Sequence, residues 1–169
     1  EIPARGEGRA ASGEGHAALR LTAASLRVLG ECFRLLPSLV SFGFNENRMG
    51  DADAQVLLDA LGAAECGPKL TRLQLRNNKL SRLPDNFGGM VGLTELDMAY
   101  NEIEEIPRSV GELTSLARLD LGRNRIEKTP ASLGDLKSLS RLALSHNRIT
   151  NATFRVSKSS IFRFVNLIN

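Results

Sequence analysis

The chain has 169 residues, of which 42% are hydrophobic and only 5% aromatic, with no tryptophan. This composition predicts a single domain with a continuous aliphatic core. The formal net charge is +3, and the acidic residues are interleaved with the basic ones, without a run of lysine or arginine. The charge pattern therefore does not indicate a nucleic-acid-binding protein.

The cysteines and the hydropathy pattern indicate the compartment. Cys32 and Cys66 lie in apolar helical contexts, which predicts buried free thiols rather than a disulfide framework. No stretch approaches the length of a membrane-spanning helix, and the N-terminal residues lack the apolar segment of a signal peptide. We therefore expect a cytoplasmic protein without a membrane span. Because the chain begins at Glu1 rather than at methionine, a fragment of a longer protein is an open alternative.

The N-terminal part divides into a tail and a degenerate repeat. Residues 1–15 are rich in Gly, Ala, Arg and Glu and are predicted to be disordered, because they offer little apolar surface to bury. A degenerate repeat follows from residue 16. Its helical spacing of apolar residues is set by Leu26, Leu29, Phe33 and Leu36.

The next repeat runs from Leu39 to Leu70 and is 31 residues long. Its additional length predicts a helix. Asp51 or Asp53 is expected to cap the start of this helix, and Gly67 to end it. The predicted buried stripe of the helix consists of Val56, Leu57, Ala60, Leu61 and Ala64.

Four phrases of one template then recur at intervals of 23 residues: LTRLQLRNNKL, LTELDMAYNEI, LARLDLGRNRI and LSRLALSHNRI. A fixed period of this kind is typical of a solenoid. In each phrase, L-x-L predicts a short strand with its leucines inwards and the intervening residues outwards. We predict an α/β solenoid of about six to seven repeats. It is a right-handed curved stack, with a parallel sheet on the concave face and helices or irregular turns on the convex face.

Each phrase carries asparagine in the turn after its strand, at Asn78, Asn101, Asn124 and Asn147. An asparagine side chain offers two donors and an acceptor, so these amides are predicted to form a ladder that satisfies buried backbone groups. After Ile149 the template fades, although its phase would place Val165 and Leu167 in inward positions. Residues 151–169 are therefore either a degenerate C-terminal repeat with an edge strand or a frayed end.

The phrase N-x-[LI]-x-x-[LIT]-P-x-x-[FVL]-G-x-[LM], over roughly residues 70–150, resembles the short leucine-rich repeats of intracellular Ras-associated and Scribble-like scaffolds. The preceding segment, NRMGDADAQVLLDALGAAECGPKLTRLQL, resembles the longer ribonuclease-inhibitor-like repeat. The resemblance implies a leucine-rich repeat domain over residues 16–150 that binds proteins. A small GTPase or another component of a signalling complex is the implied partner.

Residue patterns of catalytic and metal sites are missing from the sequence. There is no P-loop and no CxxC or HxxxH spacing, and His16 and His146 lie at opposite ends of the predicted stack. We therefore expect neither enzymatic activity nor a cofactor or metal ion.

The predicted concave face is the better candidate site, because the outward residues of neighbouring strands come together there. Arginine and tyrosine are enriched at binding hot spots. The candidate binding residues are Arg72, Gln74, Arg76, Glu95, Asp97, Tyr100, Arg118, Asp120, Arg123, Arg141 and His146. A plainer interpretation is that Arg72, Glu95 and Arg118 pair across the strands and only keep the face soluble.

The sequence favours a non-enzymatic module that binds a partner protein on this face, in intracellular signalling. One alternative is a sensing or regulatory arm of a larger enzyme or immune-type receptor. A second alternative is a structural spacer.

Overall fold

The computed structural model of the chain describes residues 23–83, 90–152 and 164–166. The predicted disordered tail, residues 1–15, lies outside this part. Within these residues, two α-helices and three 3-10 helices alternate with short strands. In chain order they are α1 (Ala23–Arg34), β1 (Ser41–Gly43), α2 (Asp51–Ala63), η1 (Gly67–Lys69), β2 (Arg72–Gln74), β3 (Glu95–Asp97), η2 (Arg108–Glu112), β4 (Arg118–Asp120), β5 (Lys128–Thr129), η3 (Ala131–Asp135), β6 (Arg141–Ala143), β7 (Asn151–Ala152) and β8 (Phe164–Asn166).

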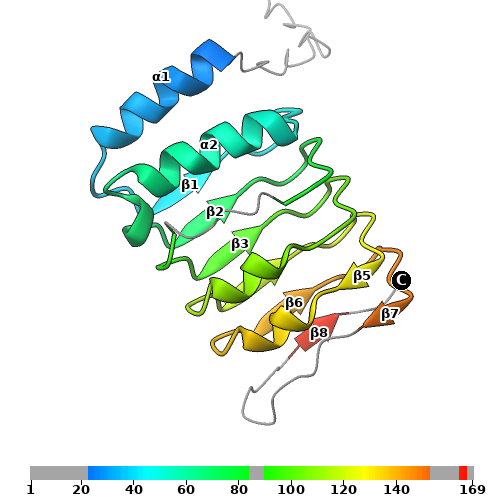
Figure 1. Cartoon of the computed structure of the whole chain (residues 1–169). Helices are drawn as coiled ribbons and strands as arrows, with labels where there is room; N and C mark the ends of the chain where they lie inside the picture. The colour runs from blue at the N-terminus through cyan, green and yellow to red at the C-terminus, as the bar shows by residue number, and fades with distance from the viewer. Residues whose placement is uncertain (1–22, 84–89, 153–163, 167–169) are drawn as a thin grey trace, which may run out of the picture.

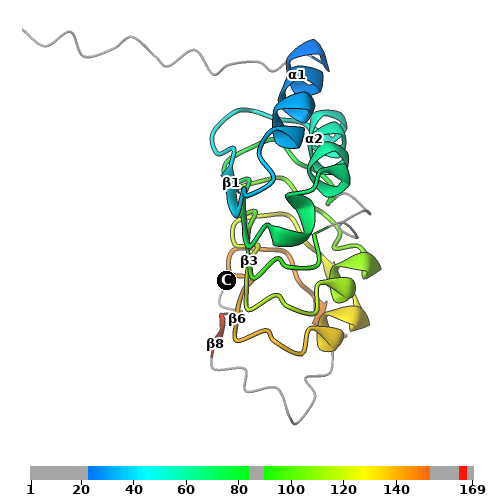
Figure 2. The ribbon, with the colours of Figure 1, turned by 90° about the vertical axis from the view of Figure 1, so that its left-hand side faces the viewer.

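The main sheet is parallel and has the order β1-β2-β3-β4-β6-β8 (Figure 1). Its register follows the 23-residue period, since Leu73 lies opposite Leu96 and Leu96 opposite Leu119. Between β1 and β2 the step is longer, with Phe42 opposite Leu73. Figure 2 shows the sheet along one side of the stack and the helices along the other. The predicted α/β solenoid is confirmed.

The C-terminal segment contributes two of the described strands. β8 lies beside β6 with Val165 opposite Leu142, which continues the 23-residue phase. β7 pairs with β5 in a two-stranded parallel sheet on the other side of the stack. The remaining residues of 151–169, including Leu167, lie outside the described part.

The core consists of aliphatic side chains from the inward positions of each repeat. Leu73, Leu96, Leu119 and Leu142 are at most 1% exposed. Burying a leucine side chain of this kind stabilises the fold by about 1.5–3 kcal/mol. At the N-terminal end of the sheet, the core is covered less well, because Phe42 is only half-buried.

The asparagine ladder joins each repeat to the one before it. The Asn101 side chain donates to the carbonyl oxygens of Leu75 and Met98, both at 3.0 Å. Its own oxygen accepts bonds from the backbone N–H groups of Asn78 and Leu80, both at 3.2 Å. Asn124 and Asn147 repeat the donor contacts one and two units further along. The predicted ladder is thus present across the described repeats.

Helix α1 packs against α2. Its Leu26 and Phe33 are both 1% exposed, and the Phe33 ring meets that of Phe42 in β1 edge-on, with 5.2 Å between the centroids. Two predictions made for this region are wrong. Leu36 lies beyond the end of the helix and is 48% exposed. Cys32 is exposed on the helix surface, because it lies on the face turned away from α2, whereas Cys66 is a buried free thiol as predicted.

Helix α2 begins at Asp51, but neither Asp51 nor Asp53 caps it. The N-cap residue is Gly50, which lacks a side chain and makes no side-chain capping bond. The Asp51 carboxylate instead accepts the backbone N–H groups of Ser81 and Arg82 in the next repeat, at 2.7 and 3.1 Å. Of the predicted stripe, Leu57, Leu61 and Ala64 are buried and Ala60 is partly buried. Val56 is the exception, because it is 40% exposed, whereas Leu58, outside the predicted stripe, is buried.

Replacing Asp51 with alanine should therefore weaken a contact between repeats rather than a helix cap. We expect Asp51→Ala to lower the free energy of unfolding by about 2 kcal/mol, because hydrogen bonds to a charged acceptor are lost and backbone donors lose their partner. Asp53→Ala is the matched control, since it removes the same charge from the same helical turn. Denaturant unfolding with equal losses for both variants would contradict this role.

On the convex side, two of the described short helices are preceded by an extended turn at proline. Pro107 and Pro130 have extended backbone angles and stand directly before η2 and η3. The two helices pack closely, because a Cβ at Gly111 would lie 2.8 Å from the backbone oxygen of Ser132. Compact helical turns therefore stack behind β3, β4 and β6.

Candidate functional site

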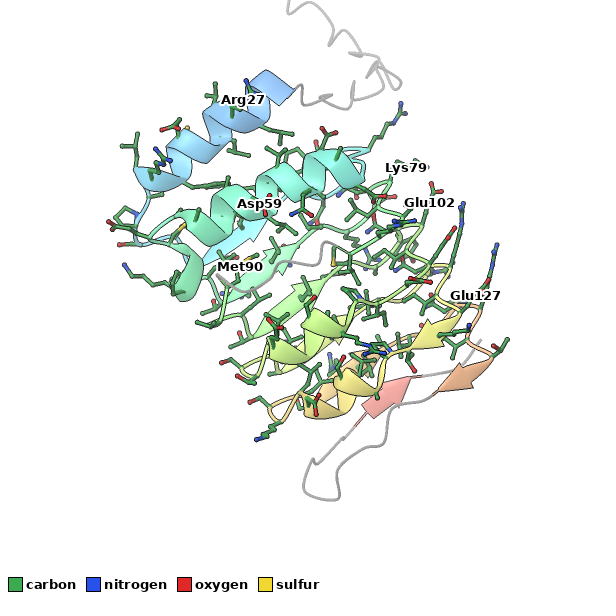
Figure 3. All side chains as sticks on the ribbon, in the orientation of Figure 1. Arg27, Asp59, Lys79, Met90, Glu102 and Glu127 are labelled. Atoms are coloured by element: carbon green, nitrogen blue, oxygen red, sulfur yellow. The ribbon has the colours of Figure 1, made fainter. Side chains whose placement is uncertain are left out.

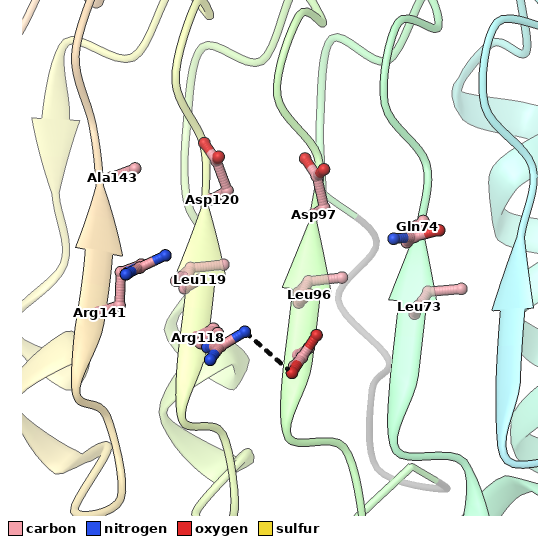
Figure 4. Close-up of a pocket in the computed structure, with 10 residues that line it drawn as sticks. Leu73, Gln74, Leu96, Asp97, Arg118, Leu119, Asp120, Arg141 and Ala143 are labelled. Atoms are coloured by element: carbon pink, nitrogen blue, oxygen red, sulfur yellow. Dashed lines mark hydrogen bonds and ion pairs between the residues drawn. The ribbon is translucent and has the colours of Figure 1, made fainter.

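The outward residues of β2, β3, β4 and β6 form the concave face, and a shallow hollow of about 170 Å³ lies in its centre (Figure 4). We call it the concave hollow. In the strand register, Glu95, Arg118 and Arg141 form one row along the hollow. Asp97 and Asp120 form a second row, further along the same strands. The structure brings six of the predicted residues together there, namely Gln74, Glu95, Asp97, Arg118, Asp120 and Arg141.

Arg118 and Glu95 form an ion pair between neighbouring strands, with 3.3 Å between Nη1 and Oε1. Their side chains are 58% and 39% exposed, so solvent screens the pair, and its contribution to stability is about 0.2–1 kcal/mol. Arg72 lies on the other side of Glu95 in register, but makes no ion pair with the described residues. The interpretation that these residues only pair across the strands therefore holds for Arg118 and Glu95. It does not account for Arg72.

Asp97 and Asp120 lie opposite each other on β3 and β4. Each uses Oδ1 to accept the backbone N–H two residues further on, at Ala99 and Gly122, at 3.0 and 2.9 Å. Burial, together with the nearby charge of Asp120, raises the pKa of Asp97, although the Ala99 N–H and Arg76 act in the opposite direction. The hollow thus holds two fixed, adjacent carboxylates.

The raised pKa of Asp97 predicts a pH-dependent effect of the substitution Asp97→Asn. A carboxyl group with a raised folded-state pKa favours folding below its unfolded pKa, and this advantage is lost as the pH rises through the folded value. The amide introduced by the substitution would keep an acceptor for the Ala99 N–H and remove the charge. We expect the variant to be more stable at neutral pH, by about 0.2–1 kcal/mol, the range for cross-strand charge pairs.

Below the unfolded pKa of Asp97 the wild-type carboxyl is protonated, so this stability difference should shrink towards zero. Urea unfolding of both proteins at pH 7 and at acid pH measures the difference directly. A variant that is less stable at pH 7, or a gap that widens in acid, would refute this view of the carboxylate pair.

A second group of predicted residues lies where β3 leads into its turn. The guanidinium carbon of Arg76 is 4.2 Å from the ring centroid of Tyr100, and that of Arg123 is 5.0 Å away. Arg76 also approaches Asp97, with 3.9 Å between Nη1 and Oδ2. We call Arg76, Tyr100 and Arg123 the tyrosine cluster. Cation–π contacts at such partly exposed positions contribute about 0.5–1 kcal/mol each.

The backbone of this turn has a feature that the sequence reasoning missed. The residue before each template asparagine adopts a left-handed conformation, with φ of 57° at Tyr100, 55° at Arg123 and 56° at His146. Non-glycine residues adopt this conformation rarely. The sequence does mark these positions, because all three residues occupy the same slot of the template, directly before its asparagine. The conformation sets the direction in which the Tyr100 side chain leaves the sheet.

His146 occupies this slot two repeats beyond Tyr100. The strand spacing of about 4.8 Å therefore separates the two positions by roughly 10 Å along the stack. His146 is exposed on its turn. The predicted residues thus form the concave hollow and the tyrosine cluster, with Arg72 and His146 outside both.

A third charged group lies at the rim of the stack and was not among the predicted residues. Glu102 accepts from Lys79 at 3.1 Å and from Arg125 at 2.9 Å, across three successive repeats. Figure 3 shows Lys79 and Glu102 together at one edge. The hydrogen bond from Lys79, followed by the charge of Arg125, lowers the pKa of Glu102. Lys79 and Arg125 are therefore already paired with a carboxylate, unlike Arg72.

The described residues contain no group of three or more His, Cys, Asp or Glu side chains placed to hold a metal ion. None of the described helices combines the length and the apolar character needed to cross a membrane.

A sequence model of the leucine rich repeat family matches residues 68–126 and 101–149. The fold is similar to that of a leucine-rich repeat protein from Leptospira interrogans, with a TM-score of 0.55 and 22% identity, covering 79% of this chain and 36% of that chain. Internalin C2 from Listeria monocytogenes is similar at a TM-score of 0.54 and 20% identity, covering 69% and 46%. No curated protein sequence matches the chain.

The BIR3–SERK2 complex from Arabidopsis thaliana contains a third similar chain, with a TM-score of 0.51 and 23% identity, covering 64% of this chain and 56% of that chain. At these identities the similarity shows a shared fold. The chain spans less than two thirds of each of these three structures.

Proposed function

We propose, from the premise that this chain is a leucine-rich repeat protein, that it is a non-enzymatic module which binds a partner protein across its concave face. Leucine-rich repeat domains as a class mediate protein–protein interaction through extended concave surfaces. The observation that carries the proposal is the convergence of six charged or polar side chains around one open hollow. The leucines between them face the core, so the outward residues are free to vary with the partner.

The composition of the hollow suits a binding role. Among the described residues, its walls contain no histidine, cysteine or serine that could act as a nucleophile or as its base. Arginine and carboxylate side chains fixed on strands instead suit the recognition of a charged protein surface.

The finer identity of the partner rests on the sequence resemblance of residues 70–150 to Ras-associated and Scribble-like scaffolds. We propose a component of intracellular signalling as the partner, with a small GTPase as the first candidate, and the cytoplasm as the place of action. One similar structure, BIR3–SERK2, is itself a complex of two proteins.

A second candidate function is a sensing or regulatory arm of a larger enzyme or immune-type receptor. The observation that favours it is the partial coverage of the similar structures, of which this chain spans 36% to 56%. Binding through the concave face is common to both candidates. A structural spacer, in contrast, would need no specific concave residues.

Affinity capture with the full chain separates a binding module from a spacer. We expect the double variant Tyr100→Ala/Arg118→Glu to recover about tenfold less partner protein, or still less, than the wild type. Truncating a hot-spot residue costs about 2 kcal/mol or more of binding free energy. Arg108→Glu is the matched control, since it reverses a charge on η2, on the convex side. Partner proteins would be quantified by mass spectrometry after cross-linking, and thermal unfolding would confirm that each variant is folded.

Equal recovery by the wild type, the double variant and Arg108→Glu would contradict concave binding. Loss with Arg108→Glu alone would place the interaction on the convex side instead.

A further inference from the structure

We propose that the tyrosine cluster receives an acidic segment of the partner protein, whose carboxylates pair with Arg76 and Arg123. The inference rests on the proposed function and specifies the chemistry of the partner at one part of the concave face.

The Tyr100 ring holds two arginines that come from the repeats on either side of it. Arg76 lies one repeat before the ring and Arg123 one repeat after it, at 4.2 and 5.0 Å from the centroid. A free arginine side chain samples many rotamers, and this freedom is lost when it binds a ligand. Contact with the ring removes part of that freedom before the partner arrives, so binding costs less.

The backbone that carries the ring is held in place by the next repeat. Tyr100 has a left-handed conformation, and its N–H donates to the Gly122 carbonyl of the next repeat at 2.9 Å. The following residue, Asn101, is buried in the asparagine ladder. The cluster therefore stands on a rigid part of the stack, which a binding site for a defined group requires.

The arginines of this face exceed the carboxylates that neutralise them. Arg76 approaches Asp97 only to 3.9 Å, and that carboxylate already accepts the Ala99 N–H. Arg123 makes no ion pair with the described residues, and the same holds for Arg72 and Arg141. Asp120 is the neighbouring carboxylate that no described cation pairs with, and its Oδ1 is engaged by the Gly122 N–H. An incoming anion would meet cations that have no strong partner in the described part of the chain.

The geometry of a guanidinium group suits a carboxylate. The guanidinium carbons of Arg76 and Arg123 lie over the ring, and the N–H donors of each group lie in the plane of that group. Two of these donors match the two oxygens of an Asp or Glu side chain, and such charge-assisted pairs are the stronger hydrogen bonds of proteins. Two like charges beside one ring also repel each other, and a bound anion relieves that repulsion.

The test uses fluorescence anisotropy with the full chain and a fluorescein-labelled peptide of alternating glutamate and serine. A peptide with lysine in place of glutamate is the charge-reversed probe. We expect the glutamate peptide to bind and the lysine peptide not to bind. Arg123→Gln should raise Kd by about tenfold, because a charge-assisted hydrogen-bonded pair is lost. Tyr100→Leu should weaken binding, and Tyr100→Phe should leave it unchanged, since it keeps the ring.

Arg125→Gln is the matched control. It removes the same charge from the same repeat, but at the rim, where Arg125 is paired with Glu102 at 2.9 Å. Its Kd should equal that of the wild type. The thermal midpoint of each variant checks that the fold is kept. Arg76→Gln should also raise Kd for the glutamate peptide, which tests the second arginine independently.

Equal weakening by Arg123→Gln and Arg125→Gln would overturn the inference, because it would indicate diffuse charge attraction. Preference for the lysine peptide, absence of binding to the glutamate peptide, or wild-type affinity of Tyr100→Leu would also overturn it. If partner capture still depends on the concave residues in those cases, the proposed function stands and only the acidic chemistry is wrong.

Discussion

Replacing Asn101 by leucine is expected to lower the free energy of unfolding by about 3–5 kcal/mol. The asparagine amide bonds the Met98 carbonyl of its own repeat and, in the preceding repeat, the Leu75 carbonyl and two backbone N–H groups. Leucine has a similar branched shape but no polar atoms, so the buried N–H groups of Asn78 and Leu80 lose their acceptor, at about 1–3 kcal/mol for each before relaxation. The Leu75 and Met98 carbonyls lose one donor each and keep the bonds from the Asn78 and Asn124 amides. Denaturant unfolding of the two proteins measures the difference.

Asn47→Leu is the control for this substitution. Asn47 occupies the same template slot in the longer repeat, but its amide is more exposed and donates to the Asn45 carbonyl. We expect its cost to be much smaller than that of Asn101→Leu. Equal thermal midpoints for Asn101→Leu and the wild type would show that the ladder does not hold the repeats together.

The second large effect is expected at Gly92, in the turn before β3. A Cβ at this position would lie 2.3 Å from the carbonyl oxygen of Pro68 in the preceding repeat. The clash involves backbone atoms, so a rotamer change cannot relieve it and the two repeats must move apart. We expect Gly92→Ala to cost about 3 kcal/mol, at the upper end of the range for overpacking. The thermal midpoint should fall accordingly.

Gly50→Ala provides the matched comparison, because nothing lies within 4 Å of a Cβ built there. Gly50 is the N-cap of α2, where alanine is less favourable than glycine, and a loss within about 1 kcal/mol is expected. If both alanine variants unfold at the same temperature, close packing at Gly92 is not a constraint on the stack.

The fold could be predicted from the sequence because the repeat period fixes several levels of structure at once. Leucines spaced as L-x-L set the strands, the 23-residue interval sets the register, and the asparagine sets the turn. The structure has Leu73, Leu96, Leu119 and Leu142 side by side and buried. Where the period was broken by a longer insertion, a helical pattern still predicted α2.

The prediction failed where contacts between repeats decide the outcome. Asp51 had the sequence position of a helix cap, but the next repeat offers the N–H groups of Ser81 and Arg82, which bind its carboxylate instead. Val56 was predicted to be buried from helical spacing, and Cys32 from its apolar helical context. Which face of a helix is covered depends on the neighbouring element, and spacing within one helix does not determine it.

The candidate site was predictable as a set of outward rows but not as separate groups. Alternation along a strand places Arg118 and Asp120 on one face. The distance from Arg76 and Arg123 to the Tyr100 ring depends on a left-handed turn and on side-chain rotamers, which the spacing does not specify. The binding role of these residues is the proposal that experiment must address.

Carboxylate footprinting of the chain, alone and with the partner recovered by capture, tests concave binding most directly. Exposed Asp and Glu side chains are labelled chemically and quantified by mass spectrometry, so the same chemical group is compared on both sides of the stack. Glu95 and Asp120 report on the concave face, and Glu112 and Asp135 on η2 and η3. We predict that the partner protects Glu95 and Asp120 and leaves Glu112 and Asp135 unchanged. Protection of Glu112 and Asp135, with full labelling of the concave pair, would contradict the account.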